Sequence, residues 1–463
     1  MPNNADQNIE FSRTITFLYF KRENTKNGFI YSPPTSPQTS LFFRLPFHNS
    51  VSLIPQSFGL YNNDFYKVNT HTMASMTHPA LTGSLTPPDN TRTHNFSPGP
   101  TSLPDPVQDE IRRQCFSPDR LSSMYLSHRS PEFGTILNNT IFLMRQVMNI
   151  PDNYEVLFTH GGGHGQFAAV PLNLCPTGEE KATYLVSGTW SERAFNESKK
   201  YCSPSMISSK NDDGTYTSFP TVDEIDPDSK YVYLCSNETV NGIELFRLPD
   251  LKSRGIDVPL VVDASSDFTT KPIDWVKYNV GVLYACASKN IGHPGLTACI
   301  IRKDLIGNPN PMCPGVFDYT VNSKAGNLWN TAATFNIDVV GIVMDWIIAN
   351  GGVDEMENLS IKKSELVYDL IDSSDGFYST PLVSDEQKTV RSRMNVPFDV
   401  MGGDEAMTAE FVKEAWERGI VGLRTLTPFG VGRYLRASLY HGVSLESTEF
   451  LVEFMKEFMN KNR

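Results

Sequence analysis

The sequence lacks three features that would assign the protein to a membrane, nucleic-acid-binding or disulfide-rich class. Its 463 residues contain no run of 18 or more apolar residues, so we expect no transmembrane helix. Basic residues are not in excess, because 40 Lys and Arg stand against 52 Asp and Glu, and the net charge of −12 argues against nucleic acid as a partner. The seven cysteines are scattered without a CxxC pair. They indicate reduced thiols and favour an intracellular, cytoplasmic location without a metal site.

The first 92 residues differ in composition from the rest of the chain. They are rich in Asn, Thr, Ser and Pro, and their seven basic and five acidic residues leave the remainder a net charge of −14. We expect residues 1–92 to form a poorly ordered extension without a catalytic role. The scarcity of acidic residues leaves organelle targeting open, although the segment has no clean apolar stretch of a signal sequence.

From His94 onward, short apolar runs alternate with helical patterns. Such runs occupy 156–160, 231–235, 258–262 and 280–285. Strands this apolar are usually buried on both faces, so the alternation predicts an α/β fold with a mostly parallel sheet. In sheets of this kind the chemistry lies at the carboxyl ends of the strands, and a glycine-rich or polar sequence follows each of these runs.

The pattern changes near Gly351, beyond which long amphipathic helices alternate with short strand-like runs. The expected helices cover 360–371, 406–418 and 447–460. We therefore expect a large domain over residues 93–352 and a smaller α+β domain over residues 353–463. The first residues of the large domain are expected to pack against the small one.

Lys289 and Asp263 are the first candidates for chemistry. Lys289 directly follows an apolar strand, where a charged, unpaired lysine would be costly. A lysine in such a place can instead form a Schiff base with an aldehyde cofactor. Asp263 ends the preceding strand 26 residues upstream, and adjacent parallel strands would bring both residues to one sheet edge. A Schiff-base lysine with an acidic partner for a ring nitrogen is typical of pyridoxal phosphate enzymes. Taken singly, a surface lysine and an N-cap aspartate are the alternatives.

Three further features would suit the same cofactor. The glycine-rich turn at 161–165, which includes Gly163 and His164, follows a strand and opens a helix, so its N–H groups can hold a phosphate. Ser288 can add a hydroxyl to that phosphate, and Trp190 can stack on a cofactor ring. A tight turn and an ordinary core tryptophan are the alternative interpretations.

The motifs in this order resemble the phosphoserine aminotransferase family, pyridoxal phosphate enzymes of aminotransferase fold type I. The resemblance covers about 370 residues, from His94 to the C-terminus. It is carried by segments 95–100, 127–129, 161–167, 236–239, 265–268, 289–292, 391–398 and 436–440. It implies a large domain with a mostly parallel seven-stranded sheet, a smaller C-terminal domain, and transfer of an amino group from L-glutamate to 3-phosphohydroxypyruvate in serine biosynthesis.

The resemblance also implies roles for single residues. Lys289 would bond to the cofactor aldehyde, Asp263 would pair with the pyridine nitrogen, and Trp190 would stack on the ring. The remaining cofactor contacts would come from Gly163, His164, Thr239 and Ser288, and, across a homodimer with shared active sites, from Asn330 and Thr331. The substrate contacts would be His128, Arg129 and Arg436, because an arginine fork grips a carboxylate or phosphate with two hydrogen bonds.

The sequence departs from the family pattern at several positions. Ser288 stands where the family often has Gln, His164 where many members have Arg or a small residue, and Pro98 where a serine is usual. Near the C-terminus Gly430 takes the place of the usual arginine, and Arg433 follows three residues later. Arg433 either restores the missing charge from a shifted position or points to solvent, and both alternatives stay open.

These departures leave two alternatives to phosphoserine aminotransferase activity. A related aminotransferase with a non-phosphorylated acceptor is motivated by Gly430 and His164. The other alternative, a catalytically silent scaffold, is disfavoured by the presence of Lys289, Asp263 and Trp190.

Overall fold

The computed structural model describes residues 92–463, except for residues 120, 425, 428–429 and 432–433. The expected extension, apart from Arg92, and the candidate Arg433 therefore lie outside the described residues. Within the described part of the chain, no single helix is long and apolar enough to cross a membrane. The two consecutive helices over Thr334–Ala349 and Gly352–Asp372, bent by 83°, reach that length and composition only as a pair.

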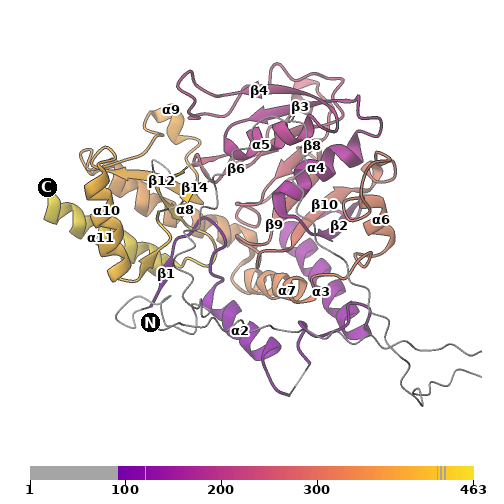
Figure 1. Ribbon diagram of the computed structural model, residues 1–463, viewed down its shortest axis with the longest axis horizontal. Helices are drawn as coiled ribbons and strands as arrows, with labels where there is room; N and C mark the ends of the chain where they lie inside the picture. The colour runs from indigo at the N-terminus through magenta and orange to yellow at the C-terminus, as the bar shows by residue number, and fades with distance from the viewer. Residues whose placement is uncertain (1–91, 120, 425, 428–429, 432–433) are drawn as a thin grey trace, which may run out of the picture. The chain divides into compact units, whose positions relative to one another are not determined.

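The central feature is a seven-stranded sheet in the order β2-β10-β9-β8-β5-β3-β4 (Figure 1). Its strands are β2 (Tyr154–Thr159), β3 (Lys181–Val186), β4 (Ser203–Ser208), β5 (Val232–Cys235), β8 (Leu260–Asp263), β9 (Val280–Cys286) and β10 (Thr297–Arg302). β10 runs antiparallel to both of its neighbours, and every other pair is parallel. The predicted α/β fold with a mostly parallel sheet is therefore confirmed.

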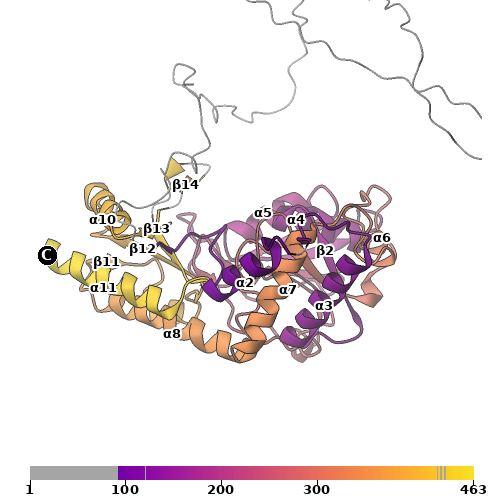
Figure 2. The same ribbon diagram turned by 90° about the horizontal axis from the view of Figure 1, so that it is seen from below.

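Helices cover both faces of this sheet, which explains why its strands are apolar throughout. One face packs against α2 (Asp105–Cys115), α3 (Pro131–Met148) and α7 (Thr334–Ala349), which lie side by side in Figure 2. The other face packs against α4 (Gly162–Leu174) and α5 (Thr189–Ser198). Tyr184 and Leu185, neighbours on β3, point into these two different cores, as the alternation of a strand requires.

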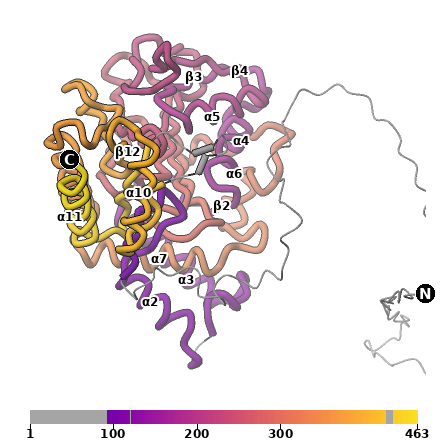
Figure 3. The backbone as a smooth tube through the Cα atoms, turned by 60° about the vertical axis from the view of Figure 1, so that its left-hand side comes forward, coloured from indigo at the N-terminus to yellow at the C-terminus, as the bar shows by residue number. Residues whose placement is uncertain are grey.

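A second apolar core lies in the C-terminal part of the chain. It surrounds a three-stranded antiparallel sheet of β11 (Tyr378–Ser379), β12 (Asn395–Val400) and β16 (Leu435–Ser438). The helices that pack on it are α8 (Gly352–Asp372), α10 (Glu405–Glu417) and α11 (Leu445–Asn462), of which α10 and α11 lie on one side of the large sheet in Figure 3.

The two cores are linked by α8 and by the start of the described chain. The first turns of α8 contribute Val353 and Met356 to the large core, and its last turns contribute Val367 and Ile371 to the second. Phe96 packs in the second core, next to the short parallel pair β1 (His94–Asn95) and β13 (Ile420–Val421). The boundary that we place between residues 352 and 353 stays a prediction. Helix α8 runs across it and contributes to both cores, so no break in the chain marks this position.

The remaining elements are short. They are β6 (Asn237–Glu238), β7 (Ile243–Glu244), α6 (Tyr319–Lys324), α9 (Asp385–Lys388), β14 (Leu426–Thr427) and β15 (Gly430–Val431). The antiparallel pair β6–β7 forms a hairpin directly after β5, at the carboxyl end of the large sheet.

Candidate active site

Lys289 and Asp263 lie at the same edge of the sheet. Asp263 is the last residue of β8, and Lys289 follows the end of β9, which pairs with β8 in parallel and sets Tyr284 opposite Asp263. The Lys289 Nζ donates a hydrogen bond of 2.7 Å to the Thr239 hydroxyl and lies 5.9 Å from the centroid of the Trp190 ring. Lysine, aspartate, threonine and tryptophan from four strand ends thus meet at one place.

The electrostatics of this place come from burial and from opposing charges. Burial raises the pKa of the Asp263 carboxyl, while hydrogen bonding from Ser265 and the charge of Lys289 oppose that rise. For Lys289 burial is the largest single influence and lowers its pKa, but the nearby Tyr440, Cys286 and Asp263 together outweigh it and raise the pKa. The Asp263 carboxylate therefore favours a positively charged group next to it. The Lys289 amine is such a cation as long as it is not bonded covalently to a cofactor.

The glycine-rich turn opens α4 toward the same place. Gly161 caps this helix at φ 98° and Gly162 follows at φ 62°, conformations that favour glycine over other residues. A Cβ atom at Gly163 would lie 3.6 Å from the Cys286 Sγ and 3.7 Å from the Asp263 Oδ2. The glycine therefore leaves a space open between the helix N-terminus and the Asp263 carboxyl.

The side chains around this space fit pyridoxal phosphate. The N-terminus of α4 offers N–H groups and a positive helix end to a phosphate, and Asp263 offers a carboxylate to a ring nitrogen. The His164 and Trp190 rings lie edge to face with their centroids 5.7 Å apart, so both border the space. The Trp190 Nε1 is buried without a hydrogen-bond partner among the described residues. Ser288 is half-buried beside Lys289, and its carbonyl accepts a hydrogen bond from the Thr101 N–H.

Arg436 reaches the same cluster from the C-terminal core. It lies on β16, is 7% exposed, and its Nη1 donates a hydrogen bond of 2.5 Å to the Thr239 carbonyl. Burial lowers the pKa of Arg436, but an arginine stays protonated in proteins. Thr239 thus joins the two groups, since its hydroxyl contacts Lys289 and its carbonyl contacts Arg436.

Four other candidates are placed outside this cluster. His128 and Arg129 lie in the loop before α3, where Arg129 is exposed and the His128 Nε2 is buried without a hydrogen-bond partner among the described residues. Asn330 and Thr331 lie in the loop between α6 and α7, half-buried and exposed respectively. In the described part of the chain none of the four is hydrogen-bonded to the Lys289 cluster, and their roles stay predictions.

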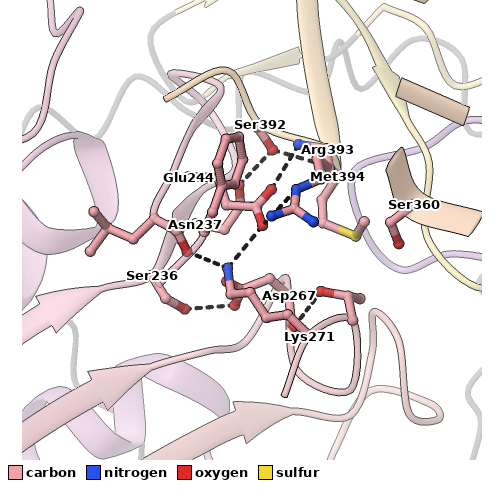
Figure 4. A network of polar contacts seen from close by, with 12 residues as sticks. Ser236, Asn237, Glu244, Asp267, Lys271, Ser360, Ser392, Arg393 and Met394 are labelled. Carbon is pink, nitrogen blue, oxygen red and sulfur yellow. Dashed lines mark hydrogen bonds and ion pairs between the residues drawn. The ribbon is translucent and has the colours of Figure 1, made fainter. Parts of the chain in front are cut away.

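Sequence reasoning missed a set of buried polar residues, of which Figure 4 shows Lys271, Glu244 and Asp267. Lys271 is bound to the carboxylates of Glu244 and Asp267, and these three side chains are at most 7% exposed. Glu238, fully buried, accepts hydrogen bonds from the backbone N–H groups of Trp190 and Ser191. Asp267 lies only four residues before Lys271, but Glu244 is 27 residues from Lys271 and Glu238 is 48 and 47 residues from Trp190 and Ser191, so no local spacing reveals these contacts. Among the described residues no group of three or more His, Cys, Asp or Glu side chains is arranged to bind a metal.

Comparisons with known proteins agree on one family. The model of the class-V aminotransferases matches residues 93–451. Phosphoserine aminotransferase 2, chloroplastic, of Arabidopsis thaliana is 38% identical over 419 residues, which cover 89% of this chain and 96% of the relative. Phosphoserine aminotransferase of Drosophila melanogaster is 40% identical and covers 80% of this chain and 99% of its own. Among solved structures, the phosphoserine aminotransferase of Trichomonas vaginalis with bound pyridoxal phosphate has a TM-score of 0.71 at 32% identity. That match covers 79% of this chain and all of the other.

Proposed function

We propose that the Lys289 cluster is the catalytic centre of this chain, which belongs to the phosphoserine aminotransferase family within the class-V aminotransferases. The chain binds pyridoxal phosphate and transfers the amino group between L-glutamate and 3-phosphohydroxypyruvate, which gives O-phospho-L-serine and 2-oxoglutarate in serine biosynthesis. One observation carries the assignment of the site. Thr239 holds both the candidate Schiff-base lysine and the candidate substrate arginine through hydrogen bonds of its own hydroxyl and carbonyl.

The cofactor would be held by residues from four strand ends, those of β2, β3, β8 and β9. The N–H groups of Gly163 and His164 and the Ser288 hydroxyl would bind its phosphate, and Trp190 would stack on its ring. Asp263 would bind the protonated ring nitrogen, in agreement with its burial beside a cation. When bound, the cofactor supplies an electron-accepting ring that carries the amino group between the two substrates.

Lys289 would move the proton in each half of the reaction. Its Nζ would take a proton from the α-carbon of the amino acid and return it to the cofactor carbon to which the nitrogen is attached, as a general base and then a general acid. The Thr239 hydroxyl, 2.7 Å from this nitrogen, would keep it oriented toward the reacting atoms. One site would serve both substrates in turn, so ping-pong kinetics are expected.

Arginines would bind the anionic ends of the substrates. Arg436 would bind the α-carboxylate, because its planar fork can form two parallel hydrogen bonds while buried next to Thr239. His128 and Arg129, together with Arg433, would bind the substrate phosphate in place of the arginine that Gly430 replaces.

A homodimer with shared active sites would complete this centre. The pair Asn330 and Thr331 follows Trp329, a large aromatic side chain that is 53% exposed. If the subunit interface covered Trp329, the pair beside it would reach the phosphate site of the partner subunit. Sedimentation equilibrium of the cofactor-loaded protein would give twice the chain mass, and a monomer with full activity would contradict the proposal.

The location of the enzyme is a separate proposal. The match to the chloroplastic Arabidopsis relative extends over 419 residues, more than the segment from 92 to 463 contains. We propose that residues 1–92 direct the chain to an organelle, in keeping with their few acidic residues. A fluorescent protein fused behind residues 1–92 should enter an organelle, whereas a diffuse cytoplasmic signal would leave the enzyme cytoplasmic.

A single-turnover experiment tests the substrate. O-phospho-L-serine and, in a separate sample, L-serine are added to the cofactor-loaded protein, and the loss of its yellow absorbance is followed. Conversion with O-phospho-L-serine alone is expected, because the substrate phosphate would be bound by charged groups. Equal or faster conversion with L-serine would keep the aminotransferase chemistry but overturn the phosphorylated substrate.

A further inference from the structure

Helix α5 carries Trp190 and begins without a capping side chain of its own. The residue at its N-cap is Gly188, which has no side-chain oxygen to offer to the first N–H groups of the helix. Two residues from the β6–β7 hairpin supply the missing acceptors. Asn241 Oδ1 accepts a hydrogen bond of 2.9 Å from the Thr189 N–H, and the two oxygens of Glu238 accept hydrogen bonds of 2.8 Å from Trp190 and Ser191.

The glycine at position 188 is required for this arrangement. A Cβ atom there would lie 2.5 Å from the Glu238 Cγ and 2.7 Å from the Asn241 Oδ1, which is closer than side-chain carbons approach. The backbone at Gly188 is extended, with φ 177°, so the demand comes from space and not from conformation. Gly188 thus has no side chain that could cap the helix, and for the same reason it leaves room for Glu238 and Asn241 to approach the helix start.

The Ser191 hydroxyl adds a third donor to the Glu238 carboxylate. This hydroxyl accepts hydrogen bonds from the N–H groups of Ser187 and Gly188, so its single proton is free to be donated, and Glu238 Oε1 lies 2.6 Å away. Both Glu238 oxygens therefore face donors, which suits an ionised carboxylate at the positive end of a helix. Burial raises the pKa of Glu238, and the hydrogen bonds from Ser191 and Trp190 oppose that rise.

The same short segment also fixes the reactive lysine. Thr239, the next residue after Glu238, accepts the hydrogen bond from the Lys289 Nζ. We propose that Glu238 is a positioning residue that sets the Trp190 ring against Lys289, so that a cofactor ring attached to Lys289 meets the face of Trp190. This inference rests on the proposed function, because it assigns Trp190 to the cofactor ring.

The first test uses the full-length, cofactor-free protein. In the Glu238→Gln variant one carboxylate oxygen becomes an NH2 group, which cannot accept a hydrogen bond from the start of α5. Amide hydrogen exchange of Trp190 and Ser191 is expected to become about tenfold faster, the factor for losing one hydrogen bond to a charged group. Asp399→Asn is the matched control, because Asp399 is a buried carboxylate on β12 that bonds to Ser379 and not to α5. In the Asp399→Asn variant the Trp190 amide should exchange at the same rate as in the wild type.

The second test uses the cofactor. For Glu238→Gln the dissociation constant of pyridoxal phosphate should rise about tenfold. The visible circular dichroism of the bound ring should also fall, because the ring is no longer held against Trp190. Asp399→Asn should change neither quantity. Unchanged exchange, affinity and dichroism in Glu238→Gln would overturn the inference while the wild type still binds the cofactor. Failure of the wild type to bind pyridoxal phosphate at Lys289 would instead overturn the proposed function.

A second variant decides the matter if Glu238→Gln does not fold. Asn241→Ala removes the acceptor of the Thr189 N–H and leaves the Glu238 carboxylate in place. Exchange of the Thr189 amide should become faster and the cofactor affinity should fall, both by less than for the loss of a charged acceptor. If the Asn241→Ala variant keeps wild-type exchange and affinity, the hairpin does not position α5 and the inference is wrong.

Discussion

Replacing Lys271 with methionine should lower the free energy of unfolding more than replacing any charged residue on the surface. The Lys271 Nζ lies 2.8 Å from Glu244 Oε1, 2.7 Å from Asp267 Oδ2 and 2.5 Å from the Leu245 carbonyl (Figure 4). The Lys271 side chain is 7% exposed, and the two carboxylates are exposed by 2% and 1%. Methionine keeps much of the volume of lysine but removes the cation between the two anions.

The magnitude follows from what the variant leaves behind. Removing one partner of a buried ion pair leaves an uncompensated charge and costs about 3–5 kcal/mol. Glu244 would still accept a hydrogen bond of 2.7 Å from the Arg393 N–H, and Asp267 would still accept one of 2.6 Å from Ser236. Because both carboxylates keep a donor, we expect the lower end of that range, a loss of about 3 kcal/mol in the free energy of unfolding.

Denaturant unfolding followed by circular dichroism measures this loss, with a surface lysine as the control. Lys181 forms an ion pair of 3.0 Å with Asp226, but its side chain is 56% exposed. Lys181→Met should therefore change the free energy of unfolding by only about 0–1 kcal/mol. If Lys271→Met lost no more than Lys181→Met, the buried cluster would contribute nothing and the reasoning from burial would be refuted.

Two further predictions concern the reaction and the effect of pH. Lys289→Ala should lower the rate of amino transfer by about 10²–10⁴-fold even with cofactor bound, because a positioned acid–base group contributes about that factor. Substantial turnover of O-phospho-L-serine by this variant would mean that another lysine transfers the proton. His441 is buried, its Nε2 lies 2.9 Å from the Thr269 hydroxyl, and its pKa is lowered from 6.5 to about 3 by burial and by Lys363. The unfolded chain therefore binds the proton more readily than the folded one, so stability falls as the pH falls from 6.5 toward 3, by up to about 1.4 kcal/mol per pH unit. His441→Gln should flatten this dependence by that amount in unfolding experiments at several pH values, and an unchanged slope would show that His441 does not titrate in this window.

Much of the sheet and the core of the site could be predicted because they depend on local patterns. The apolar runs that end before Gly161, Ser236 and Ser288 mark strand ends, and parallel pairing then brings Asp263 and Lys289 together. The sequence predicts the start of α8 at residue 360, whereas the helix begins at Gly352, because the pair Gly351-Gly352 is typical of a turn and no capping side chain marks the helix start. The antiparallel direction of β10 is not shown by the sequence pattern either, because it depends on how β10 pairs with β9 and with the distant β2.

The capping of α5 could not be predicted for a different physical reason. A helix start is normally recognised from a Ser, Thr, Asp or Asn at the N-cap, and here that residue is Gly188. The acceptors come from Glu238 and Asn241, about 50 residues further along the chain, and only packing brings them to the helix. The same holds for Lys271, whose partner Glu244 lies 27 residues away.

The β6–β7 hairpin explains why these buried polar groups lie next to the proposed catalytic residues. At one end of the hairpin, the Asn237 amide donates hydrogen bonds of 2.8 Å to Ser266 in the large core and to Asn395 on β12. Since β12 pairs with β16, which carries Arg436, these bonds set the position of Arg436 relative to Lys289, which follows the end of β9. Apolar packing is not directional and would tolerate small shifts between the two cores, whereas hydrogen bonds with lengths near 2.8 Å allow one arrangement. Polar contacts therefore fix the distance between Arg436, which we propose binds the substrate, and Lys289, which we propose transfers its proton.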